Sequence, residues 1–348
     1  MPSIAAAATA LPPHVITQAQ ARAACEKVYA EKADLKRLLR VFDRSGVERR
    51  HFAFPAEYYL AERSFDRRNA DFIEQGTALA EKAARACLER AGVEAAQVDH
   101  LVVVTTTGLA TPSLDALLAP RLGLGKGTRR WPLFGLGCAG GAGGLLRAAD
   151  LLRDRPGGRA LVVSVELCGQ VFSTRAAGAT DVVGAALFGD GAAAVLVDAD
   201  LAAAGPRVTA SRTVLFEESK HLMGWDFTQD GMRLVLSREV TDLVRRRLRP
   251  VVEAFLDASG LALRDVAHWL LHPGGRKILE AYREAFGFDD GALQWTQGSL
   301  ARVGNLSSAS VLFELSDLLE SGRARPGDKA VMVALGPGFA AEMLVLEW

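Results

Sequence analysis

Long apolar runs broken by short polar turns recur along the chain and predict strands buried on both faces. The segments between these runs have apolar residues at helical spacing, so strands and helices alternate. This order predicts an α/β protein with stacked, parallel-rich sheets and helices between and outside them. Strands are expected at residues 98–108, 159–166, 192–197, 265–271 and 328–335, antiparallel strands and loops at 206–236, and helices at 14–42, 69–91, 145–153, 237–258 and 306–319.

The second half of the chain repeats the order and spacing of the first. From Asp99, at the start of a predicted strand, to Cys138 is 39 residues, and from Asp265, at the equivalent point, to Asn305 is 40. Each interval ends just before a predicted helix. The matched spacing indicates an internal duplication with two βαβ-containing halves.

Composition and charge narrow the class of protein. The 348 residues are 49% hydrophobic, which is enough for a large core, and 41 basic residues balance 41 acidic ones, so no overall field favours nucleic acid. No apolar run reaches about 18 residues, and the alanine-rich N-terminus lacks basic residues, so we expect neither a membrane span nor a signal peptide. Four cysteines without a CxxC pair favour a reducing, cytoplasmic location.

A glycine-rich turn at residues 135–144 places Cys138 between an apolar segment, residues 131–134, and a predicted helix. Helix N-termini favour the thiolate, because their N–H groups and dipole stabilise negative charge. The glycines let backbone and substrate atoms approach closely. We therefore interpret Cys138 as a candidate nucleophile, which needs a base and donors for an oxyanion.

The same glycines fit the dinucleotide-binding pattern G-x-G-x-x-G, at Gly135, Gly137 and Gly140, and Glu166 ends the following strand. Two observations oppose this alternative. The pattern does not open a first βαβ unit, and a cysteine occupies a position where only backbone is needed. We therefore expect no nicotinamide cofactor.

Two polar residues of the second half could complete a nucleophilic site. His272 ends a buried strand before Pro-Gly-Gly, and strand carboxyl ends are where ligands bind in doubly wound sheets, although a satisfied core histidine is the alternative. Asn305 precedes a predicted helix and can cap it, while its amide remains able to donate. The duplication places His272 opposite Cys138.

A row of arginines, Arg37, Arg40 and Arg44, recurs at helical spacing beside Lys36, and residues 47–54 add further basic side chains. On pattern alone such a row is either a solvated helix face or a site for an anionic ligand, for which phosphate is the obvious candidate.

Five motifs carry a resemblance to a known family. They are Gly-Cys-Ala-Gly-Gly at 137–141, Phe-Gly-Asp-Gly-Ala-Ala at 188–193, His-Pro-Gly-Gly at 272–275, Gly-Asn-Leu-Ser-Ser-Ala-Ser at 304–310 and Gly-Pro-Gly at 336–338. With these motifs the chain resembles, over nearly its whole length, the type III polyketide synthases, the chalcone synthase-like group of the thiolase superfamily. The interval from His272 to Asn305 is also the usual one in that family.

The resemblance implies a thiolase-like fold of two duplicated halves in α-β-α-β-α layers. It implies an N-terminal half, residues 1–205, with the nucleophile and a CoA-binding basic helix, and a C-terminal half, residues 206–348, with the other two catalytic residues. The family's Cys-His-Asn triad falls on Cys138, His272 and Asn305. A homodimer that uses acyl-CoA and malonyl-CoA is implied, without a metal or other cofactor.

The implied mechanism gives each triad residue a role. His272, as imidazolium, holds Cys138 as thiolate, and an acyl-CoA starter is transferred to the sulfur. Malonyl-CoA then loses its carboxylate, and His272 and Asn305 stabilise the resulting enolate. The enolate attacks the Cys138 thioester in a Claisen condensation, and the extended chain reloads onto the sulfur.

The same matching assigns binding residues. It places the CoA phosphates on Arg37, Arg40 and Arg44, which favours the anion-binding interpretation of that row, and Gly274 in the pantetheine tunnel. Residues that line the substrate cavity by this matching are Thr106, Cys168, Val171, Phe188 and Leu234.

Departures from the plant members of the family bear on the product. Leu234 replaces one of two gate phenylalanines, Cys168 and Val171 replace cavity threonines, Thr111 replaces a methionine across the dimer interface, and Leu335 replaces a phenylalanine. A more apolar cavity favours a long aliphatic starter, as in alkylpyrone and alkylresorcinol synthases of bacteria. Cys168 also occurs in bacterial synthases that form tetrahydroxynaphthalene from malonyl-CoA alone, so that product is the alternative.

Two further hypotheses remain. A ketoacyl-ACP synthase III uses the same triad, but Gln-Ala-Asn normally follows its histidine, whereas Pro-Gly-Gly follows His272. A non-catalytic acyl-CoA-binding relative is the other, and the intact triad opposes it.

Overall fold

The computed structural model describes residues 1–348 except 33, 173–177, 201–204 and 230. Over the described residues, nine strands form one mixed sheet in the order β11-β12-β13-β8-β1-β7-β6-β4-β5. Its two halves meet where β1 pairs with β8, at Ser3 and Arg207. The strands are β1 (Ser3–Ala10), β4 (His100–Val104), β5 (Arg129–Leu133), β6 (Arg159–Leu167) and β7 (Asp190–Asp198) in the first half, and β8 (Arg207–Leu215), β11 (His268–Leu271), β12 (Lys329–Gly336) and β13 (Ala340–Glu347) in the second.

Both halves of the sheet have the same strand order and directions, counted outward from the β1–β8 junction. In the first half β1, β7 and β6 are antiparallel neighbours and β4 is parallel to β6. In the second, β8, β13 and β12 are antiparallel neighbours and β11 is parallel to β12. The repeat confirms the predicted duplication. The predicted parallel-rich sheets are wrong, because an apolar run reveals burial on both faces and not strand direction.

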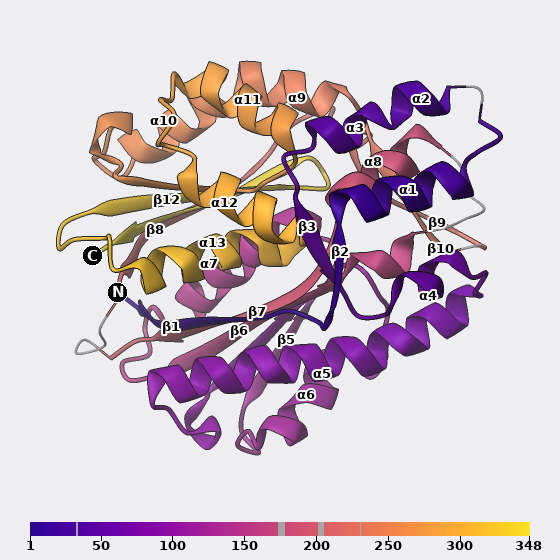
Figure 1. Ribbon diagram of the computed structural model, residues 1–348. Coiled ribbons are helices and arrows are strands. Elements are labelled where there is room, and N and C mark those ends of the chain that lie inside the picture. Colours follow the sequence, from indigo (N-terminus) through magenta and orange to yellow (C-terminus); the bar gives the residue numbers. More distant parts are fainter. Residues whose placement is uncertain (33, 173–177, 201–204, 230) are drawn as a thin grey trace.

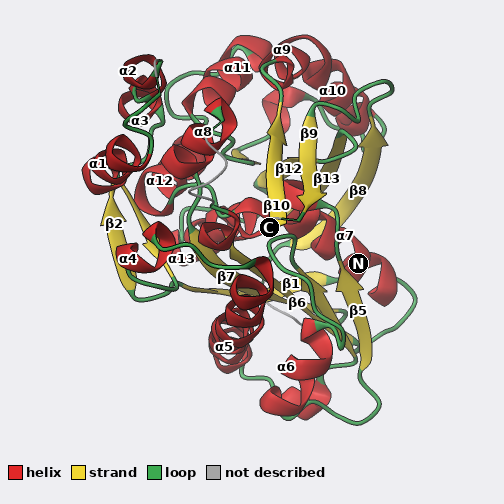
Figure 2. Cartoon of the chain, turned by 90° about the vertical axis from the view of Figure 1, so that its right-hand side faces the viewer, coloured by secondary structure: helices red, strands yellow, loops and turns green. Residues whose placement is uncertain are grey.

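Helices lie between the two halves of the sheet and on both outer faces, which confirms the predicted α-β-α-β-α layers (Figure 1, Figure 2). In the middle layer α7 and α13 bury apolar side chains against strands of both halves. Helices α5 and α6 cover the outer face of the first half, and α10 and α11 cover that of the second. Their bounds are α5 (Phe65–Ala91), α6 (Leu114–Leu122), α7 (Gly140–Leu152), α10 (Arg249–Asp257), α11 (Arg276–Phe286) and α13 (Ser310–Ser321).

Residues 14–42, predicted as one helix, form a strand and three short helices, with residue 33 outside the described residues. The β-branched stretch His14–Thr17 is β2, which pairs antiparallel with β3 (Arg49–Phe52). Thr17 then caps the first helix by accepting from the backbone N–H of Gln20. The helices are α1 (Gln18–Val28), α2 (Leu35–Leu38) and α3 (Arg40–Arg44).

Other predicted elements differ mainly at their ends. The helix predicted at 145–153 begins at Gly140, and the one predicted at 306–319 begins at Ser310 after a short 3₁₀ turn. The helix predicted at 237–258 contains a π-helical turn, Val244–Leu248. The expected antiparallel strands at 206–236 include β8 and a hairpin. The remaining elements are α4 (Ala56–Leu60), α8 (Ala179–Leu187), β9 (Met223–Thr228), β10 (Gly231–Leu236), α9 (Glu239–Leu243) and α12 (Gln294–Val303).

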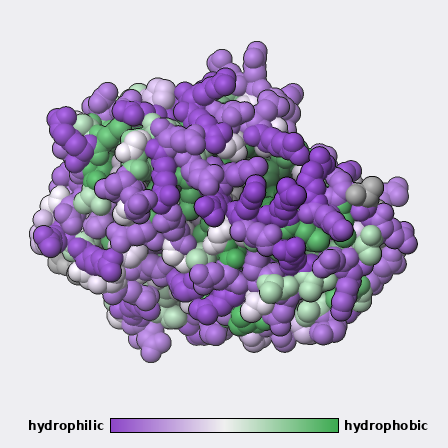
Figure 3. Space-filling view, turned by 45° about the horizontal axis from the view of Figure 1, so that its top comes forward, coloured by the Kyte–Doolittle hydropathy of each residue, from purple (hydrophilic) through white to green (hydrophobic). Residues whose placement is uncertain are grey.

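The face of the molecule in Figure 3 is mainly hydrophilic, with hydrophobic groups in small patches. Among the helices of the described residues, none has the length and apolar character needed to cross a membrane.

Candidate active site

Cys138 is buried in a 3₁₀ turn, Gly137–Ala139, directly before α7. The glycines around it are needed for close packing. A Cβ on Gly141 would lie 2.2 Å from the carbonyl oxygen of Ser308, and one on Gly137, whose φ is +51°, would lie 2.4 Å from Cδ of Pro337. Glycine at position 141 therefore lets this turn pack against the segment after Asn305, and glycine at position 137 lets it pack against Pro337.

His272 follows β11 and is buried. Its backbone N–H donates to the carbonyl of Val333 at 3.0 Å, which continues the pairing of β11 with β12. Its own carbonyl accepts from the hydroxyl of Tyr282 at 3.2 Å. The chain then turns at Gly275, with φ of +108°, into α11. The backbone of His272 is thus fixed from two sides.

Asn305 lies beside the loop of Phe188. The N–H of Asn305 donates to Leu187 at 2.8 Å, and the N–H of Gly189 donates to the carbonyl of Asn305 at 3.0 Å. The side-chain oxygen of Asn305 accepts from the N–H of Ser307 at 2.8 Å. The side-chain nitrogen Nδ2 remains, and it lies 3.5 Å from Nε2 of His272. The sequence expectation that Asn305 could cap a local turn and still offer a donor agrees with this geometry.

Ser307 joins the cysteine to this pair. The thiol of Cys138 donates to Oγ of Ser307 at 3.7 Å. Ser307 has φ of +51°, in the left-handed region that a non-glycine residue rarely adopts. Sequence reasoning gave Ser307 no role, although it lies in the Gly-Asn-Leu-Ser-Ser motif. Among the described residues, hydrogen bonds therefore join His272 to Asn305 and Cys138 to Ser307, and none joins Cys138 to His272 directly.

Burial controls the protonation of the two titratable groups. It raises the pKa of the Cys138 thiol to about 12, although the hydrogen bond to Ser307 acts in the opposite direction. It lowers the pKa of His272 to about 3. No described carboxylate offsets the burial of the imidazole. Burial therefore favours the neutral thiol and the neutral imidazole, whereas the family resemblance implied a preformed thiolate–imidazolium pair.

Glu166 is a buried carboxyl group close enough to Cys138 to affect the pKa of its thiol. No catalytic or structural role was predicted for it from the sequence. It accepts from the N–H and the hydroxyl of Thr106, both at 3.0 Å, from Thr107 at 2.8 Å, and from Ser308. Burial raises its pKa despite these donors. The Glu166 network connects the end of β4 with the turn before α13.

A cavity of about 500 Å³ lies beside Phe188, which pairs with Asn305 through a β-bridge. Cys138, His272 and Asn305 are not among the residues that line it. Of the predicted cavity residues, Cys168, Val171, Phe188 and Leu234 line it, whereas the Thr106 hydroxyl binds Glu166 instead. The rest of the wall was missed, because it comes from α1, β2, β3, α4 and α8, and the sequence carries no local sign of their approach. The wall is mostly apolar and includes Ile16, Ala21, Ala24, Phe52, Leu60 and Phe172.

The predicted CoA-binding arginines lie on the surface of α2 and α3. Arg37 also pairs with Asp34 at 2.9 Å. The end of α3 is tied to the loop after His272, because the N–H of Arg276 donates to the carbonyl of Ser45 at 3.1 Å. The fold therefore brings Arg44 and Gly274 to neighbouring segments. No group of three or more metal-binding side chains occurs within the part of the chain that the structure describes.

Two family models together match most of the chain. The model described as chalcone and stilbene synthases, N-terminal domain, matches residues 2–201. That of the 3-oxoacyl-[acyl-carrier-protein] synthase III C terminal matches residues 256–348.

Known proteins match over the full length. The chain is 43% identical to a 1,3,6,8-tetrahydroxynaphthalene synthase of Streptomyces peucetius subsp. caesius, over 99% of this chain and 93% of the relative. It is 34% identical to a putative chalcone synthase of Bacillus subtilis (strain 168), over 98% and 97%. The crystal structure of 1,3,6,8-tetrahydroxynaphthalene synthase from Streptomyces coelicolor A3(2) superposes with a TM-score of 0.96 at 27% identity, and the match covers 99% of both chains.

Proposed function

The chain belongs to the type III polyketide synthases, which catalyse decarboxylative Claisen condensation, and we propose that Cys138, His272 and Asn305 carry out this reaction. One observation carries the proposal. Nδ2 of Asn305 lies 3.5 Å from Nε2 of His272, and Ser307, two residues after Asn305, contacts the Cys138 sulfur at 3.7 Å. A thiol, an imidazole and an amide from three separate segments are therefore buried close together.

The first step loads the starter. Because burial favours the neutral forms of the thiol and the imidazole, His272 accepts the thiol proton as the sulfur attacks the acyl-CoA carbonyl. The C–S bond to CoA breaks, and CoA leaves as a thiolate that solvent protonates. His272 keeps the proton from the thiol on Nε2. The product is an acyl thioester on Cys138.

The second step extends it. Malonyl-CoA binds with its thioester carbonyl between Nδ2 of Asn305 and Nε2 of His272, and loss of CO2 leaves a CoA enolate. The two N–H donors stabilise its negative oxygen, and each such donor typically contributes about 3 kcal/mol. The enolate carbon attacks the thioester and releases the Cys138 thiolate, so that the extended chain is now attached to CoA. The thiolate then attacks the thioester carbonyl of this chain, the C–S bond to CoA breaks, and CoA leaves.

The two halves of the chain divide this work. We assign the nucleophile and the basic surface to residues 1–205, and His272 and Asn305 to residues 206–348. Arg37, Arg40 and Arg44 bind the CoA phosphates, and the pantetheine arm passes Gly274. CoA-linked substrates suffice for this chemistry, without a metal or redox cofactor.

The cavity supports a long aliphatic starter. Its volume of about 500 Å³ exceeds what one aromatic ring needs, and its wall is mostly apolar. The side chains of Leu234 and Phe188 both lie next to Gly184. A Cβ added to Gly184 would lie 3.6 Å from the side chain of Leu234 and 3.4 Å from that of Phe188. A flexible chain can fill such a space without leaving polar groups unpaired. Cyclisation then gives an alkylpyrone or alkylresorcinol.

The second candidate is a malonyl-primed synthase that forms tetrahydroxynaphthalene. It is favoured by the 43% identity to a protein of that name and by Cys168 in the cavity wall. A panel of acyl-CoAs with malonyl-CoA, analysed by mass spectrometry, separates the two. Products that retain the alkyl tail support the first candidate, and the same naphthalene from malonyl-CoA alone, whatever starter is added, supports the second.

Transfer to a carrier protein is a separate question, because the C-terminal match is to an acyl-carrier-protein synthase. Several condensations on malonyl-CoA support the proposed function. One condensation that requires malonyl-ACP would contradict it.

We also propose a homodimer formed through β5. This strand is the outer edge of the first half (Figure 2), and Trp131 and Phe134 beside it are 39% and 49% exposed. A second copy related by a two-fold axis would pair this edge with itself and cover both rings. In analytical ultracentrifugation the Trp131→Glu variant should sediment with half the mass of the wild-type dimer. A wild type that sediments with the mass of a monomer would refute the dimer.

The four cysteines are buried and form no disulfide, which fits the proposed cytoplasmic location.

A further inference from the structure

The residue before His272 has a backbone N–H that points away from the sheet. Strand β11 is the outermost strand of its half, and β12 is its neighbour on the inner side. Successive N–H groups of a strand point to opposite sides, and that of His272 already donates to β12 at Val333. The N–H of Leu271 therefore faces the open edge in a fully buried place, where an unpaired donor is costly.

Thr296 of α12 supplies the missing acceptor. Its Oγ1 accepts from the N–H of Leu271 at 3.2 Å and donates to Oε2 of Glu314 at 2.8 Å. Thr296 and Glu314 are fully buried. Glu314 belongs to α13, the helix that begins five residues after Asn305. Two hydrogen bonds thus connect the strand that ends just before His272 with the helix that follows Asn305.

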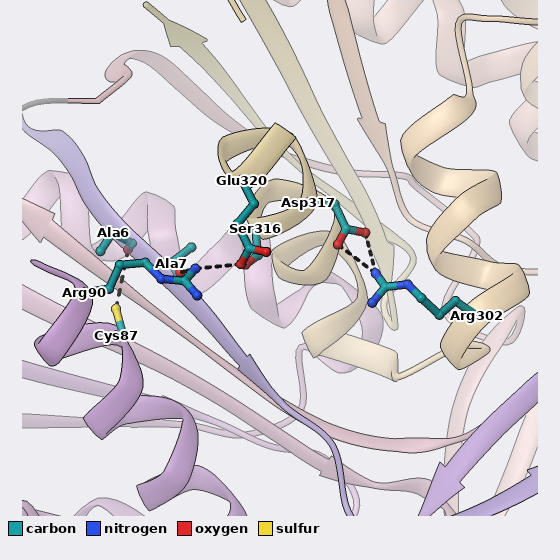
Figure 4. A network of polar contacts seen from close by, with 8 residues as sticks. All are labelled: Ala6, Ala7, Cys87, Arg90, Arg302, Ser316, Asp317 and Glu320. Atoms are coloured by element: carbon teal, nitrogen blue, oxygen red, sulfur yellow. Dashed lines mark hydrogen bonds and ion pairs between the residues drawn. The ribbon is translucent and has the colours of Figure 1, made fainter. Parts of the chain in front are cut away.

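The same two helices are connected again nearer the surface. Arg302 of α12 donates to both carboxylate oxygens of Asp317 on α13, at 2.7 and 2.6 Å (Figure 4). Glu320, one turn further, pairs with Arg90 of α5 at 2.6 Å. These ion pairs hold α13 in place without touching β11. Removing one of these ion pairs therefore tests the general packing of the helices, while the hydrogen bond to Leu271 stays intact.

We propose that Thr296 and Glu314 form a positioning pair that sets His272 at the correct distance from Asn305 for decarboxylation of malonyl-CoA. The inference rests on the proposed roles of His272 and Asn305. Thr296 and Glu314 act through the backbone beside His272 and touch no substrate. The Asn305–His272 contact is 3.5 Å, so a small shift of His272 would move one of two donors away from the enolate oxygen.

The surroundings of Glu314 favour its neutral carboxyl form. No cation is paired with it among the described contacts, and its Oε1 is buried without a partner. Burial raises the pKa of Glu314 well above its usual value, with a smaller contribution from Asp317. An ionised carboxylate here would be uncompensated. Glutamine should therefore replace it, because the amide oxygen can accept from Thr296 in the same way.

The test compares variants of the link with variants of its surroundings. Thr296→Val removes the hydroxyl at nearly constant shape, and Thr296→Ser retains it. Ser299→Ala is the matched control, since Ser299 is a fully buried hydroxyl of the same helix with no described hydrogen bond. Arg302→Met removes the ion pair between the same two helices. The readouts are kcat and KM for malonyl-CoA decarboxylation and the melting temperature.

Thr296→Val should lower kcat about tenfold or more with KM for malonyl-CoA within about twofold, because positioning is lost and CoA binding is not. Thr296→Ser and Glu314→Gln should restore or retain at least about a third of the wild-type kcat. Ser299→Ala and Arg302→Met should leave kcat unchanged, whatever they do to the melting temperature. A loss of kcat confined to the Thr296–Glu314 link, independent of the melting temperature, indicates positioning rather than a general effect on stability.

Wild-type kcat in folded Thr296→Val, or an equal loss of kcat in Arg302→Met, would overturn the inference. Should Thr296→Val not fold, Glu314→Met tests the same link, because it keeps the bond to Leu271 and removes its anchor. Unchanged kcat in Glu314→Met would then overturn the inference. If the wild type itself does not decarboxylate malonyl-CoA, the proposed function fails. If the wild type does so and the link variants match it, only the positioning pair fails.

Discussion

The side-chain nitrogen of Asn305 lies 3.5 Å from Nε2 of His272, although 33 residues separate the two along the chain. The side-chain oxygen of Asn305 accepts a hydrogen bond from the N–H of Ser307, so Nδ2 is the side-chain atom that faces the histidine. In the proposed mechanism, with a proton on Nε2, the pair offers two donors to one oxygen atom, which suits an enolate better than a neutral carbonyl.

Replacing Asn305 should separate the two half-reactions. In Asn305→Ala, decarboxylation of malonyl-CoA should fall about 100-fold or more, because one enolate donor is lost, while loading of Cys138 falls much less. Asn305→Asp is the matched variant, since it keeps the acceptor for Ser307 and removes the donor. Loading is followed by mass spectrometry and decarboxylation by release of CO2. Equal loss of both activities would contradict the assigned role.

Cys138→Ala should abolish the acyl-enzyme. The sulfur is the only atom to which the proposed mechanism attaches the starter, so no adduct should form with any acyl-CoA. Cys168→Ala is the control, because Cys168 is also a buried thiol and lines the cavity. Intact-protein mass spectrometry should find the adduct in the Cys168 variant and not in the Cys138 variant. A surviving adduct on Cys138→Ala would refute the nucleophile.

Leu234→Phe should shift preference toward shorter starters. Leu234 shares the cavity wall with Phe188, and a phenyl ring there would occupy space that an alkyl chain needs. Leu234→Met, which nearly conserves volume, should keep the wild-type selectivity. The measurement is kcat/KM across acyl-CoAs of increasing length. An unchanged profile in the phenylalanine variant would remove the role of this position.

Glu314 should make stability depend on pH in a definite direction. Its folded pKa is raised, so the folded state binds its proton more tightly than the unfolded state does. This contribution is complete below the unfolded pKa of about 4.3 and is lost as pH rises, at up to about 1.4 kcal/mol per pH unit. The Glu314→Gln variant has no titrating group at this position, so its free energy of unfolding lacks this dependence on pH. Denaturant unfolding from pH 5 to 8 should therefore favour the glutamine variant increasingly as pH rises, and parallel curves would contradict a raised pKa.

The arginines of α3 should affect binding of CoA substrates rather than chemistry. Replacing Arg40 and Arg44 by alanine should raise KM for acyl-CoA severalfold with little change in kcat. The difference should shrink at high salt, because exposed charges are screened. Arg153→Ala, at an exposed position after α7, is the control and should leave KM unchanged. A loss confined to kcat would exclude phosphate binding at Arg40 and Arg44.

Much of the fold and of the proposed triad could be predicted from local sequence. Apolar runs located the strands, and equal spacing revealed that the element containing Cys138 and that containing Asn305 are equivalent. The helix predicted at 69–91 does end at Ala91, and Gly92 after it adopts the left-handed conformation. These features depend on neighbours along the chain, which a sequence displays directly.

Other features depend on segments that meet only after folding. Strand direction, the contribution of α1 and β2 to the cavity wall, and the protonation of Cys138 and His272 each depend on what packs beside a residue. The pair of Thr296 and Glu314 is of the same kind, since neither residue belongs to a motif. The sequence alone singled out the residues that are proposed to carry the chemistry. The tertiary structure decided which donors surround them and which charges survive burial, because hydrogen bonding and desolvation act between atoms that are close in space and not in the chain.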